Sequence, residues 1–288
     1  MGGKILIAGA GGQVGQELAN ADTTCEIIAL TRSELDITHK NSVREAVHAH
    51  QPDIIINAAA YTAVDKAEQE AKRAYAINRD GVKYLAQTCA EHSIPLLHIS
   101  TDFVFDGEKE TAYTEDDSIA PLGVYSQSKA EGEIILRELL PEHINLRTSW
   151  VFSSSGDNFV KAMLRLGQDR AELNIVSDQR GCPTSAASIA DTLIHIVHQY
   201  LEGKSIPWGT YHYCNQPVTN RYEFARSIFT LVSAIDNRPI PKLNPILTSE
   251  YPTPARRPLN SELDCQKIEK AFGITRPDWH DELMKVLI

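Results

Sequence analysis

Tyr125 and Lys129 are the residues of this chain whose types and spacing best suit proton transfer. On a helix, residues four positions apart lie on one face, so the phenol and the ammonium group can reach the same ligand. A tyrosine with its ordinary pKa of about 10 is a poor acid or base at neutral pH. A neighbouring ammonium group stabilises the phenolate and lowers that pKa. The pair therefore predicts the proton-transfer half of a hydride-transfer site, although most Tyr-x-x-x-Lys sequences are ordinary helix surface.

A glycine-rich turn near the N-terminus supports this interpretation. The apolar run 4–8 leads directly into glycines spaced three residues apart, and a helix-like sequence follows them. Such glycines let the backbone approach a pyrophosphate, whose charge is met by the N-terminus of the next helix. We therefore expect a dinucleotide to bind at this turn. The expected contacts are Gly9, Gly12, Gln13, Val14 and Gly15.

Further segments carry a resemblance to a known family. Ser100-Thr101-Asp102 lies between the glycine turn and Tyr125, and Asn57-Ala58-Ala59-Ala60 follows an apolar run. Together with the first two motifs, these segments resemble the extended short-chain dehydrogenase/reductase family. Longer stretches across the chain are similar to one branch of it, the dTDP-4-dehydrorhamnose reductases. These stretches are 63–68, 147–152, 178–184 and 251–258.

The resemblance implies a reaction and a role for each catalytic residue. The reaction is NADPH-dependent reduction of the 4-keto group of dTDP-6-deoxy-L-lyxo-4-hexulose to dTDP-L-rhamnose, the last step of dTDP-rhamnose biosynthesis. Tyr125 would give a proton to the carbonyl oxygen, and Thr101 would donate a hydrogen bond to the same atom. Lys129 would hold the nicotinamide ribose and lower the pKa of the tyrosine.

Four residues are expected to bind the substrate beside Thr101. The resemblance implies that Asp102 contacts the sugar and that Trp150 packs an aromatic face against the substrate. Arg256 and Arg257 are candidates for the diphosphate, because guanidinium groups match phosphate oxygens in geometry. We expect one of these two arginines to point to solvent or to a carboxylate instead.

The end of the second strand-like run, 25–30, indicates the cofactor. Enzymes specific for NAD usually carry an acidic residue here for the ribose 2′-hydroxyl. This chain has Thr31 and Arg32, which can bind a 2′-phosphate, although Glu34 weakens the charge argument. We expect NADPH, with NADH tolerated. The resemblance adds Asp36 and Ile37 near the adenine, and further cofactor contacts from Ala58, Ala59, Ala60 and Thr62.

Composition excludes several classes of protein. The chain has 288 residues, of which 42% are hydrophobic, and a net charge of −10, which argues against a nucleic-acid surface. No apolar stretch is long enough to span a membrane, and no signal-like segment precedes the first strand. The five scattered cysteines include no C-x-x-C pair and predict reduced thiols. We expect a cytoplasmic protein whose partner is a small dTDP-sugar.

Apolar strand-like runs alternate with helical ones, which predicts an α/β fold with a Rossmann-type, doubly wound parallel sheet. A smaller, mostly C-terminal α/β substrate-binding domain should follow. We expect an NADP(H)-binding domain over 1–150, with returning segments near 173–216, and a mainly substrate-binding domain over 151–288. The proline-rich segment 239–258 should be irregular. Strands are expected near 4–8, 25–30, 53–57, 94–99, 143–148, 173–176 and 210–214. Helices are expected near 13–20, 40–50, 73–92, 124–140, 158–168, 186–201 and 222–234.

Metal binding and oligomerisation receive little support. The resemblance includes magnesium-linked dimers joined by acidic residues, and Glu17 could match one of these, but segment 184–188 has no carboxylate for another. The histidines show no metal-ligand spacing, and His98, inside an apolar run, should be a satisfied buried side chain. We therefore expect no metal, treat magnesium as doubtful, and expect a monomer or weak homodimer.

Three alternatives stay open. A sugar-nucleotide 4,6-dehydratase would carry a glutamate where this chain has Phe103. An epimerase of the same family uses the same tyrosine and lysine, but segments 147–150 and 251–258 favour a reductase. A non-catalytic protein resembling the regulatory subunit of methionine adenosyltransferase would not need the catalytic residues, which are intact here.

Overall fold

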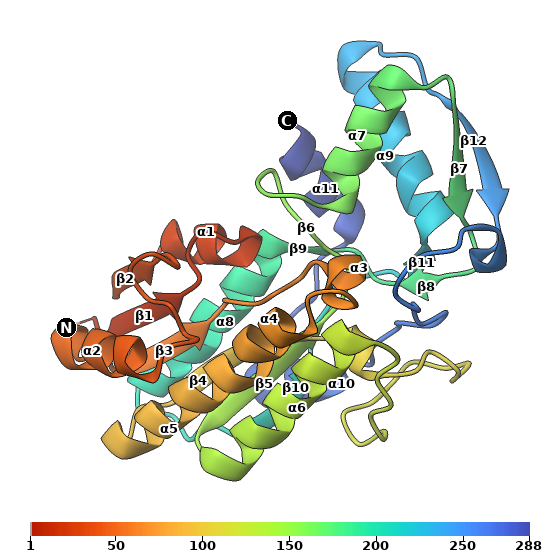
Figure 1. Ribbon diagram of the computed structural model, residues 1–288. Helices are drawn as coiled ribbons and strands as arrows, with labels where there is room; N and C mark the ends of the chain where they lie inside the picture. Colours follow the sequence, from red (N-terminus) through yellow and green to blue (C-terminus); the bar gives the residue numbers. More distant parts are fainter. Residues whose placement is uncertain (1) are drawn as a thin grey trace.

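The protein, a computed structural model that describes residues 2–288, is built around a parallel sheet of six strands (Figure 1). The strand order is β10-β5-β4-β3-β1-β2. The direction of progression reverses between β1 and β3, which is where ligands bind in open α/β sheets. The strands are β1 (Lys4–Ala8), β2 (Glu26–Leu30), β3 (Ile54–Asn57), β4 (Leu96–Thr101), β5 (His143–Thr148) and β10 (Gly209–His212).

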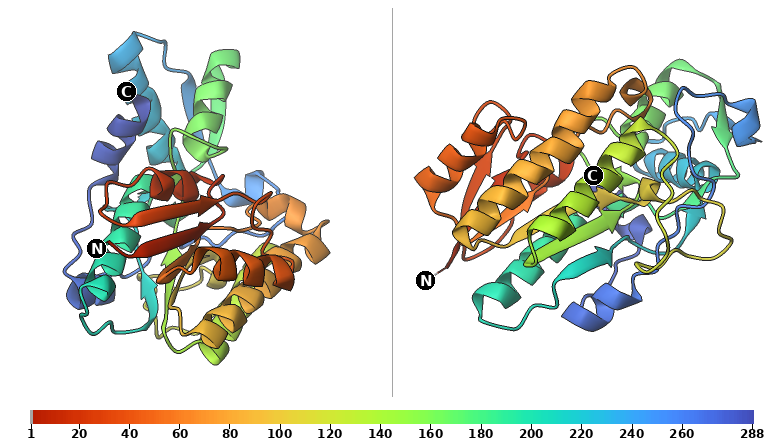
Figure 2. Two further views of the ribbon diagram at one scale, coloured as in Figure 1. Left: turned by 90° about the vertical axis from the view of Figure 1, so that its left-hand side faces the viewer. Right: turned by 60° about the horizontal axis from the view of Figure 1, so that its bottom comes forward.

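Helices cover both faces of this sheet, as the two views in Figure 2 show. Alternate residues of a strand point to opposite faces, and Ile5 and Ile7 of β1 join one apolar cluster while Leu6 and Ala8 join another. The first cluster is covered by α1 (Gln13–Ala19) and α8 (Ala186–Leu201). The second is covered by α2 (Lys40–His50), α4 (Ala71–Tyr75), a π-helical turn η1 (Ala76–Gly81), α5 (Val82–His92) and α6 (Val124–Leu139). The doubly wound fold class is therefore confirmed.

A smaller unit stands beside the carboxyl ends of the strands (Figure 1). Its own apolar cluster includes Phe152, Phe224 and Trp279. Its helices are α7 (Phe159–Asp169), α9 (Arg221–Asp236) and α11 (Trp279–Leu287), and its two-stranded parallel sheet pairs β7 (Glu172–Val176) with β12 (Lys242–Ile246). Of the segment 173–216, α8 and β10 rejoin the large sheet, whereas β7 stays with β12.

The remaining elements are short. They are α3 (Val64–Ala67), η2 (Asp102–Val104), β6 (Val151–Phe152) paired with β9 (Thr184–Ser185), β8 (Arg180–Gly181) paired with β11 (Thr219–Asn220), η3 (Thr248–Glu250) and α10 (Gln266–Phe272). None of the helices in residues 2–288 has the length and apolar character needed to cross a membrane.

For the predicted elements, the sequence-based boundaries agree with the observed ones to within a few residues, but one predicted irregular segment contains a strand. Segment 239–258 was expected to be irregular, but Lys242–Ile246 forms β12 and pairs in register with β7. Pro245 lies opposite Ile175 in that register. A proline is tolerated on an edge strand because its missing N–H can face away from the partner, and β12 has only one partner strand. Helices α10 and α11 were not anticipated.

Candidate active site

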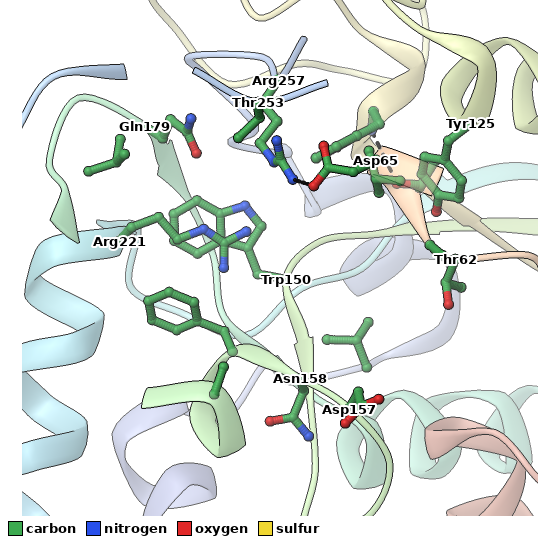
Figure 3. A pocket seen from close by; sticks show the side chains of 18 of the residues that line it. Thr62, Asp65, Tyr125, Trp150, Asp157, Asn158, Gln179, Arg221, Thr253 and Arg257 are labelled. Atoms are coloured by element: carbon green, nitrogen blue, oxygen red, sulfur yellow. Dashed lines mark hydrogen bonds and ion pairs between the residues drawn. The ribbon is translucent and has the colours of Figure 1, made fainter. Parts of the chain in front are cut away.

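A cavity of about 1530 Å³ lies between the carboxyl ends of the large sheet and the smaller unit (Figure 3). Its lining includes the glycine turn before α1, the first residue of α9, Arg221, and residues as far along the chain as Arg257. Sites for one small ligand usually enclose about 300–1000 Å³. This cavity is therefore large enough for two ligands side by side.

The end of β4 brings Thr101 and Asp102 to the cavity. The Thr101 hydroxyl accepts a hydrogen bond from the Phe103 amide at 3.2 Å and donates one to Asp102 Oδ1 at 2.9 Å. Asp102 is 3% exposed, and its Oδ2 has no hydrogen-bond partner. Burial raises the pKa of this carboxyl to about 6, against the opposing effect of the nearby Ser261 and Thr101 hydroxyls and of the Arg221 charge.

Tyr125 lies in the first turn of α6 and faces the same cavity (Figure 3). Burial raises the pKa of its phenol to about 12, although the nearby Thr101 hydroxyl lowers it in part. At neutral pH the phenol is protonated, and burial makes it a weaker acid than an ordinary tyrosine. The expected effect of Lys129 on this pKa is not what the structure shows, because burial dominates it.

Lys129, one turn further along α6, reaches back to β4. Its Nζ donates to the carbonyl oxygen of Ile99 at 2.6 Å and lies 3.3 Å from His98 Nε2. Burial lowers the pKa of the ammonium group to about 8, while the nearby Glu133 carboxylate raises it. His98 is fully buried, contacts Asn57 Nδ2 at 3.0 Å, and has a pKa well below its usual value because of burial. His98 is thus a satisfied buried side chain, as predicted.

The glycine turn forms a cradle that only glycine can build at two positions. Gly9 has a φ of +87°, and an added Cβ would lie 2.5 Å from the Ala59 nitrogen. A Cβ on Gly15 would lie 2.2 Å from the Gly9 oxygen, whereas Gly12 has room for one. Val14 lines the cavity beside this turn. These close approaches leave the backbone open toward the cavity.

Other groups beside the cradle also fit a nicotinamide dinucleotide. Ala58, Ala60 and Thr62 line the cavity next to the turn. The hydroxyls of Ser100 and Thr148 are buried at the ends of β4 and β5, line the cavity and have no hydrogen-bond partner. Unpartnered hydroxyls where parallel strands end are suited to bind polar atoms of a ligand at the switch point of the sheet.

Gln13 connects the glycine turn with the smaller unit. Its Oε1 accepts hydrogen bonds from Ser153 Oγ at 3.0 Å and from Asn158 Nδ2 at 2.9 Å. Asn158 caps α7 by accepting a hydrogen bond from the Lys161 amide. The cofactor side of the cavity is therefore joined directly to the start of a helix on the opposite side.

Four predicted cofactor residues lie at the end of β2, outside the cavity lining: Thr31, Arg32, Asp36 and Ile37. The amide and hydroxyl of Thr31 both donate to Glu34 Oε2, at 2.8 and 2.7 Å. Arg32 is 61% exposed, and its Nε is 3.5 Å from Asp36 Oδ2. Ile37 packs in the apolar cluster beneath α2 and α5. The exposed position of Arg32 leaves its guanidinium accessible to a ligand.

The segment after η3 lines part of the cavity, and its two adjacent arginines lie in different surroundings. Arg257 faces the cavity and donates to Asp65 Oδ2 at 2.7 Å, the contact drawn in Figure 3. The Ala255 amide donates to the other oxygen of Asp65 at 3.2 Å. Arg256 is 69% exposed, lies outside the lining and is 3.7 Å from Glu108 Oε1. Of the two candidates, only Arg257 is placed to meet a ligand in the cavity.

Comparison with known proteins identifies the family. Residues 3–288 match the family model described as the RmlD substrate binding domain. The chain belongs to this family. It is 47% identical to the dTDP-4-dehydrorhamnose reductase of Aggregatibacter actinomycetemcomitans, over 98% of both chains, and 43% identical to that of Sinorhizobium fredii, over 99% of this chain and 96% of the relative. The predicted family is therefore confirmed.

Solved structures of the family have the same architecture. A dTDP-4-dehydrorhamnose reductase from Clostridium acetobutylicum matches with a TM-score of 0.91 at 36% identity, over 99% of this chain and 98% of that one. The enzyme from Bacillus anthracis, solved in complex with NADP, matches with a TM-score of 0.91 at 34% identity over 99% of both chains. A UDP-glucose 4-epimerase from Brucella ovis, at 14% identity and a TM-score of 0.76, shares the fold.

Sequence reasoning did not single out Arg221, which lines the cavity beside Trp150. Arg221 stacks on the ring of Trp150, with its guanidinium carbon 3.7 Å from the ring centroid (Figure 3). Trp150 lines the cavity, and Arg221 covers the face of its ring that it stacks on. A cation in the first turn of a helix is unfavourable with the helix dipole, and Arg221 directly after the capping Asn220 was the signal that could have revealed it.

No metal centre emerges from the geometry. Within residues 2–288, no group of three or more histidine, cysteine, aspartate or glutamate side chains is placed to hold a metal ion. The five cysteines are all free, and four of them are buried. The cavity lining includes two lysines, Lys66 and Lys129, and three arginines, Arg170, Arg221 and Arg257.

Proposed function

We propose that this protein reduces dTDP-6-deoxy-L-lyxo-4-hexulose to dTDP-L-rhamnose with NADPH, completing dTDP-rhamnose biosynthesis. The observation that carries the proposal is the meeting of Thr101, Tyr125 and Lys129 with the glycine cradle in one two-ligand cavity. Similarity to named dTDP-4-dehydrorhamnose reductases over nearly the whole chain supports the same substrate. Membership of the NADP-complexed structure in the family supports the cofactor.

Three residues would carry out the chemistry at the carbonyl group. When bound, the nicotinamide dinucleotide supplies the hydride. Tyr125, which is protonated at neutral pH, gives its proton to the carbonyl oxygen as hydride delivery makes that oxygen basic. Thr101 donates a hydrogen bond to the same oxygen, which carries the developing negative charge. Lys129 binds the ribose of the nicotinamide and fixes the end of the cofactor next to β4.

The remaining cofactor contacts come from the glycine turn and from the ends of β3 and β2. Gly9, Gly12, Gln13, Val14 and Gly15 would hold the pyrophosphate, with Ala58, Ala59, Ala60 and Thr62 along the adjoining strand end. Thr31 and Arg32 would bind the 2′-phosphate, while Asp36 and Ile37 border the adenine. NADPH is thereby favoured and NADH tolerated.

The substrate would occupy the side of the cavity nearer the smaller unit. Asp102 would contact the sugar through its unpartnered Oδ2, and Arg257 would contact the diphosphate. Residues 1–150, together with α8 and β10, form the cofactor-binding part, and most of 151–288 forms the substrate-binding part. We further propose a cytoplasmic enzyme that acts as a monomer or weak homodimer.

An absorbance assay of NADPH oxidation tests this function. The substrate is dTDP-4-keto-6-deoxyglucose, supplied with or without a separate 3,5-epimerase that converts it to the L-configured keto-sugar. We expect NADPH to be consumed only when the epimerase is present. Consumption without the epimerase would point to another sugar-nucleotide reductase. Sugar interconversion without net NADPH oxidation would point to an epimerase, and no reaction with any keto-sugar would favour a non-catalytic role.

A further inference from the structure

Arg221 is the one arginine in residues 2–288 that is not solvent-exposed and has no ion pair. The other arginines that are largely shielded from solvent each face a carboxylate: Arg79, Arg147, Arg257 and Arg276. A cation that is shielded from solvent and makes no ion pair is unfavourable unless a ligand supplies a directly contacting anion. Arg221 lines the cavity, so that ligand can reach it.

The guanidinium of Arg221 is held in place by stacking rather than by hydrogen bonds. It lies 3.7 Å from the ring centroid of Trp150 and 5.0 Å from that of Phe159. The Trp150 ring rests on Gly181, where an added Cβ would lie only 2.5 Å from the indole. Stacking uses the flat face of a guanidinium and leaves the N–H groups at its edge free to donate. Trp150 thus serves as a platform that orients a cation.

The charges around Arg221 indicate which ligand it binds. Asp102 and Arg257 are its charged neighbours. Arg257 is paired with Asp65, and Asp102 accepts from Thr101 and forms no ion pair with Arg221 among the described residues. Burial lowers the pKa of Arg221 to about 10, so the group remains a cation at neutral pH. Two guanidiniums that face one cavity repel each other until an anion lies between them, and a group with several phosphate oxygens can satisfy both.

The cofactor does not account for this site. Its pyrophosphate is expected at the glycine turn and its 2′-phosphate at the end of β2, and neither place includes α9. We propose that Arg221, oriented by Trp150, is the principal anchor of the diphosphate of the sugar nucleotide, with Arg257 as its second contact. This inference rests on the proposed function for the identity of the substrate, but the binding of a nucleoside diphosphate can be tested without turnover.

Calorimetric titration of the NADP-loaded protein tests the inference with three probes: dTDP, thymidine and inorganic pyrophosphate. Arg221→Ala should weaken dTDP binding by at least about tenfold, as expected for a lost charge-assisted contact, and should weaken pyrophosphate binding similarly. Thymidine, which has no phosphate, should bind the variant and the wild type equally. Arg221→Lys keeps the charge without the planar fork and should lie between them. The matched control is Arg226→Ala, because Arg226 is on the same helix, is exposed and pairs with Glu223.

Each outcome of this experiment bears on the inference. Unchanged dTDP affinity in Arg221→Ala would overturn it, and so would an equal loss of thymidine affinity, because the arginine would then shape the base pocket. Melting temperature and NADPH affinity are measured for every variant, and Arg221→Gln replaces the alanine variant if that one does not fold. Keto-sugar reduction by the wild type is scored separately. A wild type that binds dTDP through Arg221 but does not reduce the sugar would refute the proposed function and leave the inference standing.

Discussion

The two sides of the cavity are built in different ways. On the cofactor side, the shape comes from backbone that approaches backbone, as at Gly9 and Gly15, where no Cβ fits. On the substrate side, it comes from long side chains such as Trp150, Arg221 and Arg257, which are distant in sequence and converge in space. A backbone cradle tolerates few substitutions and leaves a local sequence signature. A site made of side chains can change its ligand by single substitutions, and it leaves almost no local sequence signature.

The largest effect is expected where the two sides meet, at Tyr125. Tyr125→Phe removes the proton donor and keeps the ring, so kcat should fall by about 10²–10⁴-fold while NADPH binding survives. Steady-state kinetics and NADPH fluorescence titration measure the two quantities. Tyr75→Phe is the control, because the Tyr75 hydroxyl contacts Gln127 outside the cavity. A Tyr125→Phe enzyme within about threefold of wild type would remove Tyr125 from the mechanism.

The cofactor side should respond to a single added methyl group. Gly9→Ala places a Cβ against the Ala59 backbone, so the turn must shift, and NADPH affinity should fall by about tenfold or more. The free energy of unfolding should decrease by about 1–3 kcal/mol, as measured by urea titration. Gly203→Ala is the control for positive φ alone, since φ is +78° there and no atom lies near the added Cβ. Wild-type NADPH affinity in Gly9→Ala would show that the cradle is not made by backbone contact.

The substrate side should respond to the loss of one guanidinium and not its neighbour. Arg257→Ala should weaken dTDP binding about tenfold, because Arg257 faces the cavity, whereas Arg256→Ala should change it less than twofold. Calorimetry with the NADP-loaded protein gives both affinities. NADPH affinity should not change in either variant. A larger effect of Arg256 would mean that the segment after η3 rearranges when the nucleotide binds.

Cofactor selectivity should depend on one exposed residue. Arg32→Ala should raise the Michaelis constant for NADPH up to about tenfold and leave that for NADH nearly unchanged. Glu34→Gln should have the opposite effect, because its carboxylate repels a 2′-phosphate beside Thr31. The two variants serve as each other's control in one set of NADPH and NADH titrations. Equal changes for both cofactors in Arg32→Ala would assign it to the protein surface.

The smallest effect concerns pH. Because burial lowers the pKa of Lys129 to about 8, its ammonium form is fully present well below that pH and is lost as the pH rises through it. The kcat/KM for NADPH, which reports the free enzyme, should fall by about half between pH 7 and pH 8. Tyr125, with a pKa of about 12, adds no change in this range. Lys129→Arg should remove the decline, and a decline that persists in this variant would assign it to another group.

The same contrast explains what the sequence could predict. Tyr125 and Lys129 are about one helical turn apart on the same face of a helix, and the glycines directly follow a strand. Spacing over a few residues was therefore sufficient to predict where both groups lie. The Arg221–Trp150 stack joins residues 71 positions apart and has no local pattern. Strand β12 was missed because its proline opposed a strand assignment, while its pairing with β7 is a tertiary contact. Which of Arg256 and Arg257 faces the cavity depends on Asp65, far away in sequence.

The side-chain amide of Gln13 links the binding of the two ligands. One oxygen accepts hydrogen bonds from Ser153 and Asn158, so the turn that would seat the cofactor and the cap of α7 share a single atom. A ligand that displaces this atom changes both sites at once. By linkage, whatever factor the dinucleotide applies to the affinity for the sugar nucleotide, the sugar nucleotide must apply to the dinucleotide. Reciprocal titrations of wild type and Gln13→Ala would give that factor as a number.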